Sequence, residues 1–342
     1  MAVDKILLAA PRGFCAGVEM AIKALGWMVR TFDEPVYCYH EIVHNARVVE
    51  RFESLGVTFV NDITEVPAGS PVMLSAHGSA PEVVTAAAAT GGFAVDAVCP
   101  LVTKVHHEVK VRAARGYRIV YVGHEGHEEA EGTMAVAPLS ISRVESVAEV
   151  AALPEFDEPV ALLAQTTLSH RDWESVAAAA QDRYPEMWTP GRSDLCFATT
   201  NRQSALLAIV DRCDAMVVVG SANSSNTTAL ESLAIEAGCP RVLRINAASE
   251  LPDDLSGKVG LTAGASAPED LVRQVIDALA PLNGVEEITV TEEQEYFPPP
   301  RQLRALSDAA SDALRITMGV ATTAATADRS ISASTVLDSL AR

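Results

Sequence analysis

A repeated order of strands and helices constrains the fold of this chain more than any other feature. An extended segment ends and a helical pattern begins at three cysteines: Cys15, Cys99 and Cys196. In each block, the residue 25 positions after the cysteine follows a β-rich run and opens a polar loop; these residues are His40, His124 and Ser221. A third strand pattern ends in polar loops that contain His77, Thr166 and Ser266. This alternation predicts an α/β fold of three lobes with small parallel sheets.

The repeat also predicts the domain organisation. We assign three lobes to residues 1–98, which include the N-terminal strand, 99–195 and 196–284. Ligands of parallel α/β sheets bind outside the carboxyl ends of the strands, so a pseudo-threefold (trefoil) arrangement of the lobes would aim their loops at one central point. Residues 285–304 are expected to pack back on the lobes. Residues 305–342 are rich in Ala, Ser and Thr, and we expect a weakly ordered tail or a marginal helix there.

Charge and cysteine content narrow the classes of function. The 342 residues carry a formal net charge of -19, and a field of that sign disfavours nucleic acid and anionic membranes as partners. The N-terminal sequence lacks a basic region and a long apolar stretch, so we expect a cytoplasmic protein. In that compartment six scattered cysteines are better metal ligands or buried thiols than disulfides.

The three repeat cysteines form a candidate metal site. A thiol at a helix N-terminus is expected to have a lowered pKa, which favours the thiolate that metals bind. The paired spacing typical of zinc is absent, whereas an iron-sulfur cluster can be held by thiolates far apart in sequence. With three protein ligands, a 4Fe-4S cluster would keep one iron open as a Lewis acid, which indicates catalysis. The other three cysteines are expected to be core thiols: Cys38, Cys213 and Cys239.

Hydrogen-bond donors gather in the same loops. Imidazole, hydroxyl and amide groups that precede helices are typical of an oxyanion or phosphate site, and they include His40, His44, Asn45, Ser75, His77, His124, His127, Ser224, Asn226 and Ser266. A buried glutamate beside them would have a raised pKa and could donate a proton. The segment from Gly126 offers three candidates, and the residue pattern alone does not choose among them: Glu128, Glu129 and Glu131.

Ordered motifs along the chain resemble those of one family. They are Pro11-Arg-Gly-Phe-Cys-Ala-Gly17, Val43-His-Asn45, Ser75-Ala-His-Gly78, Cys99-Pro-Leu-Val-Thr-Lys104, Gly126-His127, Glu131-Gly-Thr133, Gln165-Thr-Thr-Leu-Ser169, Ala198-Thr-Thr-Asn-Arg-Gln203 and Ala263-Gly-Ala-Ser-Ala-Pro268. From about residue 5 to about residue 300 the chain resembles the LytB/IspH family of 4-hydroxy-3-methylbut-2-enyl diphosphate reductases. The resemblance implies a trefoil of α/β lobes around a central iron-sulfur cluster, and it identifies the family's proton donor with Glu129.

The resemblance also implies the remaining roles. The cluster would be one 4Fe-4S cluster held by Cys15, Cys99 and Cys196. The diphosphate of the substrate would be held by His44, His77, His127, Ser224, Ser225, Asn226 and Ser266, and Thr166 would orient the substrate hydroxyl. Electrons would come from a ferredoxin or flavodoxin, and the products would be isopentenyl and dimethylallyl diphosphate. Two alternatives from other classes are an open-iron hydratase, which needs no reductant, and a cluster-based sensor, which binds no diphosphate.

Overall fold

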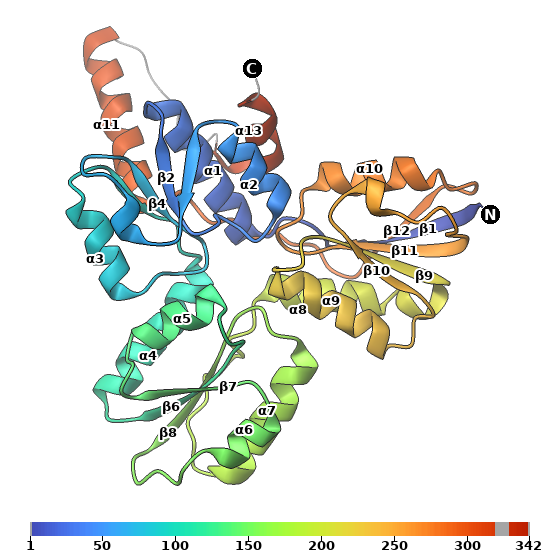
Figure 1. Cartoon of the computed structure of the whole chain (residues 1–342), viewed down its shortest axis with the longest axis horizontal. Coiled ribbons are helices and arrows are strands. Elements are labelled where there is room, and N and C mark those ends of the chain that lie inside the picture. Colours follow the sequence, from blue (N-terminus) through green and yellow to red (C-terminus); the bar gives the residue numbers. More distant parts are fainter. Residues whose placement is uncertain (1, 319–327, 341–342) are drawn as a thin grey trace. The chain divides into compact units, whose positions relative to one another are not determined.

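A computed structural model of the chain describes residues 2–318 and 328–340. It contains three parallel sheets, of five, four and three strands, with helices packed against them (Figure 1). The α/β class and the three small parallel sheets are therefore confirmed. The chain divides into two compact units: the first consists of Met1–Cys15 and Leu101–Glu293, and the second of Ala16–Pro100 and Gln294–Arg342.

The five-stranded sheet belongs to the first unit, and its strand order is β10-β9-β11-β1-β12. The strands are β1 (Val3–Ala10), β9 (Ala215–Val219), β10 (Val242–Ile245), β11 (Gly257–Ala263) and β12 (Val285–Thr289). One face packs on α10 (Glu269–Leu279), and the other packs on α8 (Phe197–Leu207) and α9 (Ser225–Glu236). Both faces are apolar because helices cover both, as expected of a parallel sheet.

The position of β1 corrects the expected domain boundaries. We assigned the N-terminal strand to the first lobe, together with the strands that follow it. In the structure β1 instead lies between β11 and β12, with Leu7 opposite Gly260 on one side and Glu286 on the other. The physical reason is burial: Ile6, Leu7 and Leu8 are almost inaccessible, and a strand that is apolar on both faces gains most in the middle of a sheet.

The three-stranded sheet also belongs to the first unit, in the order β7-β6-β8. Its strands are β6 (Arg118–Val122), β7 (Ile141–Val144) and β8 (Val160–Ala164). Four helices cover it: α4 (Pro100–Ala114) and α5 (Glu128–Ala135) on one face, and α6 (Val147–Ala152) and α7 (His170–Arg183) on the other. The helix α4 turns Val105 and Val109, four residues apart, toward Ile119 and Tyr121 of β6.

The second unit contains the four-stranded sheet, in the order β3-β2-β4-β5. Its strands are β2 (Val36–Tyr39), β3 (Val57–Val60), β4 (Val72–Leu74) and β5 (Ala94–Asp96). Its first three helices are α1 (Ala16–Thr31), α2 (Ala46–Glu53) and α3 (Pro81–Ala89). A further helix, α11 (Arg301–Met318), contacts β5.

The C-terminal segment contains more structure than its composition suggests. We expected a weakly ordered tail or a marginal helix over residues 305–342, of which 319–327 and 341–342 lie outside the described residues. The described part holds most of α11 and the short helix α13 (Ala333–Ser339), which packs against α1. The buried ammonium group of Lys23 binds the Asp328 carboxylate at 3.1 Å, and Glu19 accepts the backbone N–H of Ala333. This segment therefore docks on α1 through buried polar contacts.

The predicted site residues follow the carboxyl ends of strands in all three sheets. In the first unit, β1 leads to Cys15, β9 to Ser224, β11 to Ser266, β6 to His127 and β8 to Thr166. In the second unit, β2 leads to His44, β4 to His77 and β5 to Cys99. The cysteines directly precede or cap α1, α4 and α8, as the repeat predicted. The fold thus places these residues after strand ends, where parallel sheets bind ligands, whereas Cys196 follows the loop after α7 and not a strand.

Candidate active site

Glu129 is a buried carboxyl group at the start of α5. Its side chain is 2% exposed, and the backbone N–H and hydroxyl of Thr166 donate to its two oxygens at 2.7 and 3.0 Å. Burial raises the pKa of Glu129 to about 7, against the two hydrogen bonds from Thr166, which lower it. Glu131 is exposed and Glu128 is partly exposed. Of the three candidate glutamates, Glu129 is therefore the one whose environment suits proton donation near neutral pH.

A second buried carboxylate, Asp194, lies near Glu129 and escaped the sequence analysis. It accepts the backbone N–H of Ala164 at 3.2 Å and the ammonium group of Lys104 at 3.3 Å. Its negative charge is a further cause of the raised pKa of Glu129. Its place two residues before Cys196 was the available signal, but an aspartate before a helix is more often a cap.

Arg202 joins the loops of two predicted cluster ligands. This guanidinium is completely buried, and it donates to the carbonyl oxygen of Gly13 at 2.7 and 3.0 Å and to that of Phe14 at 3.3 Å. Its remaining nitrogen binds Glu293 at 2.9 Å and the carbonyl of Ala198 in the first turn of α8. The loop before Cys15 and the helix after Cys196 are thus held by one side chain. The sequence showed Arg202 within a motif but did not reveal its burial.

Cys196 is the residue that caps the N-terminus of α8. Its backbone N–H donates to the Thr166 carbonyl at 2.8 Å. We expected the helix terminus to lower thiol pKa values, and for Cys196 this is wrong. Burial raises its pKa to about 12, and the neighbouring Cys15 adds to the effect, while hydrogen bonds from Thr199 and Ala198 oppose it. Burial disfavours the charged thiolate of Cys196, and a bound metal cation would compensate that charge. This donor set fits an iron-sulfur cluster.

The third predicted ligand, Cys99, belongs to the second unit. Its backbone N–H donates to the carbonyl of Ala76 at 3.0 Å, and α4 begins at the next residue. The N–H of Val98 donates to Asp96, which fixes the loop between β5 and the cysteine. Cys99 thus directly precedes a helix, as Cys15 and Cys196 do.

The loops after β9 and β11 form a compact set of hydrogen-bond donors and acceptors. The Ser224 hydroxyl caps α9 by accepting the N–H of Thr227, and the Ser266 hydroxyl lies 3.4 Å from it. Asn226 accepts the N–H of Ala265 at 2.9 Å, and its amide nitrogen is buried without a hydrogen-bond partner among the described residues. A buried donor left unpaired costs free energy unless a ligand satisfies it, so this amide is suited to an anionic oxygen.

Thr227 and two glycines fix how closely these loops approach. A Cβ atom added to Gly264 would lie 2.0 Å from the Thr227 hydroxyl, and one added to Gly220 would lie 2.5 Å from it. Only glycine therefore fits at either position. The close approach brings the start of α9 against the loop that carries Ser266.

A cavity of about 360 Å³ contains two of the predicted diphosphate ligands, His127 and Ser225. His127 caps α5 and accepts the backbone N–H of Glu129 at 3.1 Å, and the Ser225 hydroxyl accepts a hydrogen bond from Thr167 at 3.0 Å. Two lining residues of this cavity therefore contact Glu129 itself and Thr167, the neighbour of Thr166 in the sequence. Within this unit, the structure brings together seven predicted residues besides the two cysteines: His127, Glu129, Thr166, Ser224, Ser225, Asn226 and Ser266.

The second unit places two further predicted ligands side by side. The rings of His44 and His77 stack with their centroids 3.9 Å apart, and His44 also contacts the Glu41 carboxylate at 3.3 Å. Burial lowers the pKa of His77 to about 4, so this imidazole is neutral at physiological pH. The neighbouring Asn45 is fully buried and caps α2. A bound anion would favour protonation of this pair.

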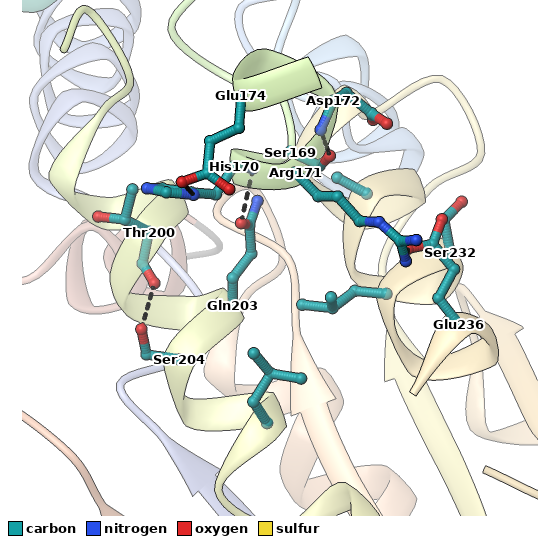
Figure 2. Close-up of a pocket in the computed structure, with 13 residues that line it drawn as sticks. Ser169, His170, Arg171, Asp172, Glu174, Thr200, Gln203, Ser204, Ser232 and Glu236 are labelled. Atoms are coloured by element: carbon teal, nitrogen blue, oxygen red, sulfur yellow. Dashed lines mark hydrogen bonds and ion pairs between the residues drawn. The ribbon is translucent and has the colours of Figure 1, made fainter. Parts of the chain in front are cut away.

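A larger cavity of about 480 Å³ lies between α7, α8 and α9 and contains none of the predicted site residues (Figure 2). Its polar groups pair with one another: Arg171 binds Glu236 at 2.7 Å, His170 contacts Glu174 at 3.4 Å, and Gln203 accepts the N–H of His170. Because these groups already satisfy one another, size alone does not make this cavity the active site.

Comparison with known proteins decides the family. The profile of the family described as LytB protein matches residues 6–280. The chain belongs to the LytB family. A LytB relative from Rhodopirellula baltica, named 4-hydroxy-3-methylbut-2-enyl diphosphate reductase, is 46% identical over 89% of this chain and 97% of its own length. A second, from Corynebacterium efficiens and of the same name, is 42% identical over 88% of this chain and 92% of its own length.

Solved LytB structures share the fold. The E-1-hydroxy-2-methyl-but-2-enyl-4-diphosphate reductase of Plasmodium falciparum matches 90% of this chain and 99% of its own with a TM-score of 0.86 and 32% identity. A structure described as (E)-4-hydroxy-3-methyl-but-2-enyl diphosphate reductase, the terminal enzyme of the non-mevalonate pathway, matches 81% of this chain and 99% of its own with a TM-score of 0.60 and 29% identity. The LytB resemblance inferred from the motifs is thus confirmed.

Proposed function

We propose that this chain reduces (E)-4-hydroxy-3-methylbut-2-enyl diphosphate to isopentenyl diphosphate and dimethylallyl diphosphate, the last step of the methylerythritol phosphate route to isoprenoids. Its LytB relatives are named as reductases of this substrate and match along nearly their whole length. The structural observation that supports this proposal most is the buried Glu129–Thr166 pair, whose Thr166 carbonyl accepts the backbone N–H of Cys196. The chemistry consumes two electrons and two protons, breaks the allylic C–O bond and releases water.

The cofactor is one 4Fe-4S cluster held by Cys15, Cys99 and Cys196. When bound, it would supply electrons singly and offer an iron without a cysteine ligand as a Lewis acid. Support for this assignment comes from the buried thiol of Cys196, which lies near Cys15 and whose thiolate a bound cation would stabilise. Each of the six cysteines is a thiol rather than part of a disulfide, which agrees with the cytoplasmic location that we propose. Among the described residues, no helix has the length and apolarity needed to cross a membrane.

The diphosphate would be bound by neutral donors and helix N-termini rather than by a cluster of lysines. Ser224, Ser225 and Asn226 at the start of α9, together with Ser266, offer hydroxyl, amide and backbone N–H donors. His127 of the same unit, and His44 and His77 of the other, would add imidazole donors. An overall negative charge does not prevent anion binding when such donors converge locally.

Glu129 and Thr166 would handle the departing oxygen. The Thr166 hydroxyl can orient the substrate hydroxyl while its backbone N–H holds the Glu129 carboxyl in place. With a pKa of about 7, Glu129 is protonated in a useful fraction of molecules at neutral pH, and it can pass that proton to the oxygen as the C–O bond breaks. A second proton at either end of the resulting allylic anion would give the two products.

Anaerobic turnover of the reconstituted protein tests this proposal. Reduced methyl viologen serves as electron donor, and both isoprenoid diphosphates are followed. We expect the wild type and the exposed control Glu131→Gln to form product, and Glu129→Gln to bind substrate without turnover. Absence of turnover by wild-type protein with a full cluster would move the function toward the hydratase or sensor alternatives, and near-normal reduction by Glu129→Gln would remove that residue from its role.

A further inference from the structure

The solvent-exposed side of α4 is a basic surface on a strongly acidic chain. Residues 99–118 contain five lysine or arginine residues and one acidic residue, although Asp and Glu outnumber Lys and Arg by 45 to 26 overall. Two of the chain's few lysines, Lys104 and Lys110, lie on this helix and are exposed. No element already assigned to substrate binding explains this concentration of positive charge.

The basic side chains share one face of the helix. At about 100° per residue, an arc of roughly 140° contains Lys104, His107 and Lys110 of α4 and Arg115, the residue directly after the helix, and all four are exposed. The opposite side carries Val102, Val105 and Val109, which are buried. We name the four exposed residues the α4 basic face.

Acidic groups near this face leave its charge largely unopposed. Glu108 lies at the edge of the arc and pairs with Arg112 at 3.3 Å, while Arg112 stacks on the Trp188 ring at 3.5 Å. Asp194 binds Lys104 at 3.3 Å, but its own side chain is completely buried, whereas that of Lys104 is 44% exposed. Arg192, two residues before Asp194, is exposed and adds a further positive charge.

The position of this face in the sequence connects it to the redox centre of the proposed function. The helix begins at Pro100, directly after the predicted cluster ligand Cys99. With a rise of about 1.5 Å per residue, Lys110 lies about 15 Å along the axis from the start of the helix. A protein bound near Lys110 and Arg115 would therefore contact the C-terminal end of the helix whose first residue follows Cys99.

We propose that the α4 basic face is the docking surface for an acidic one-electron carrier protein of the ferredoxin type. The inference rests on the proposed function, which requires two external electrons delivered one at a time. Complementary charge accelerates encounter and orients the partner, and a weak, salt-sensitive complex suits a carrier that must leave after each transfer. The rest of the acidic chain would repel such a partner, so the basic face selects the site of approach.

Charge reversal of the full-length holoenzyme tests the docking surface. The variant is Lys110→Glu with Arg115→Glu, and the matched control is Lys258→Glu with Arg273→Glu, two exposed positions on the five-stranded sheet and α10. Steady-state turnover is measured with reduced, negatively charged plant-type ferredoxin and, separately, with reduced methyl viologen. At low ionic strength we expect the KM for ferredoxin to rise about tenfold in the α4 variant, and this difference to shrink at high salt. Viologen-driven turnover and the control variant should stay within about twofold of wild type.

A ferredoxin KM that is unchanged in the α4 variant, or equally raised in the control, would overturn the proposal. Calorimetric titration of oxidised ferredoxin into the same proteins measures docking without turnover. If wild-type protein fails with viologen, the proposed function fails, while the titration still decides whether the α4 basic face binds ferredoxin. If wild-type protein bound duplex DNA more tightly than ferredoxin, and the α4 variant lost that binding, the α4 basic face would be reassigned to nucleic acid.

Discussion

The Glu129 carboxylate receives two hydrogen bonds from Thr166, one from its backbone N–H at 2.7 Å and one from its hydroxyl at 3.0 Å. Both bonds favour the charged form of Glu129, yet burial outweighs them and the pKa is raised from 4.5 to about 7. The native state therefore pays a cost to ionise this group, and both stability and activity should depend on pH through it.

Glu129→Gln should stabilise the apoprotein at high pH. Because the native pKa is raised, the folded protein keeps a proton between pH 4.5 and about 7 that the unfolded chain has lost. The free energy of unfolding of the wild type thus falls as pH rises through this window, by about 1–3 kcal/mol. Urea denaturation should show the variant equal to wild type near pH 4.5 and more stable at pH 8. A difference that does not change with pH would contradict this origin of the pKa shift.

Turnover should decline above about pH 7, as the acid form of Glu129 is lost. In Thr166→Val the hydroxyl bond that lowers the pKa is removed, so the declining limb of the pH profile should move upward, by up to about one unit. The control Thr200→Val removes a hydroxyl that donates within α8, to the Phe197 carbonyl. The pH at which turnover of this control declines should match that of the wild type. The measurement is kcat against pH with methyl viologen as donor. A downward shift in Thr166→Val would show that the hydroxyl does not stabilise the carboxylate.

Arg202→Lys should weaken the hold on the cysteine loops. A lysine can keep the charge opposite Glu293 but cannot reproduce the forked bonds to Gly13 and Phe14. We expect a loss of about 3 kcal/mol in the free energy of unfolding and faster loss of iron during anaerobic gel filtration. Arg212→Lys, at a half-exposed pair with Glu286, should change neither quantity appreciably. Full iron retention in Arg202→Lys would show that the hydrogen bonds of Arg202 to Gly13 and Phe14 are not needed to hold the cluster.

Asn226→Ala should weaken binding of inorganic diphosphate by about tenfold, since one satisfied donor to an anion is worth about 1.4 kcal/mol. The same change leaves the N–H of Ala265 without its acceptor, so thermal unfolding must be measured in parallel. Asn283→Ala, an exposed amide paired with Asp4, is the matched control. The Kd is obtained by isothermal titration of diphosphate. An unchanged Kd in a folded Asn226→Ala protein would exclude this amide from the anion site.

Asp328→Ala should destabilise the second unit by about 1–3 kcal/mol, because it leaves the buried ammonium of Lys23 with carbonyl partners alone. It also removes the acceptor of the Tyr296 hydroxyl. Asp312→Ala breaks only an exposed pair with Arg315 and should have almost no effect. Urea denaturation distinguishes the two. Equal stability of both variants would mean that the docking of the C-terminal segment on α1 contributes little.

The sequence predicted the local setting of the site well. The helix after each cysteine was predicted correctly, because a helix start depends on local residues such as Pro100. The strand expected before Cys196 is wrong, since the loop after α7 precedes this cysteine. A raised pKa was expected for a buried glutamate among Glu128, Glu129 and Glu131, and the LytB resemblance selected Glu129. Burial does raise the pKa of Glu129, to about 7. The lowered pKa predicted for the Cys196 thiol was wrong, because desolvation by the surrounding residues raises this pKa more than the helix terminus lowers it.

Long-range partners could not be predicted from the sequence. The apolar run Ile6–Leu8 is compatible with a buried strand, but it does not indicate which sheet contains that strand. Arg202 and Glu293 are 91 residues apart, and Lys23 and Asp328 are 305 apart, so neither buried pair has a local signature. A charged residue is ordinarily taken as exposed, and only the folded structure reveals these exceptions.

The place of β1 also bears on how the protein is made. The first strand to leave the ribosome pairs with β11 and β12, which begin at Gly257 and Val285. At roughly 5–20 residues per second, β1 must wait on the order of ten seconds or more for its neighbours. The loop that ends in Cys15 acquires its native support only when translation is nearly complete. Loading of the proposed cluster would therefore follow the synthesis of β11 and β12, and a chain interrupted before β11 would expose an unpaired apolar strand to proteolysis or aggregation.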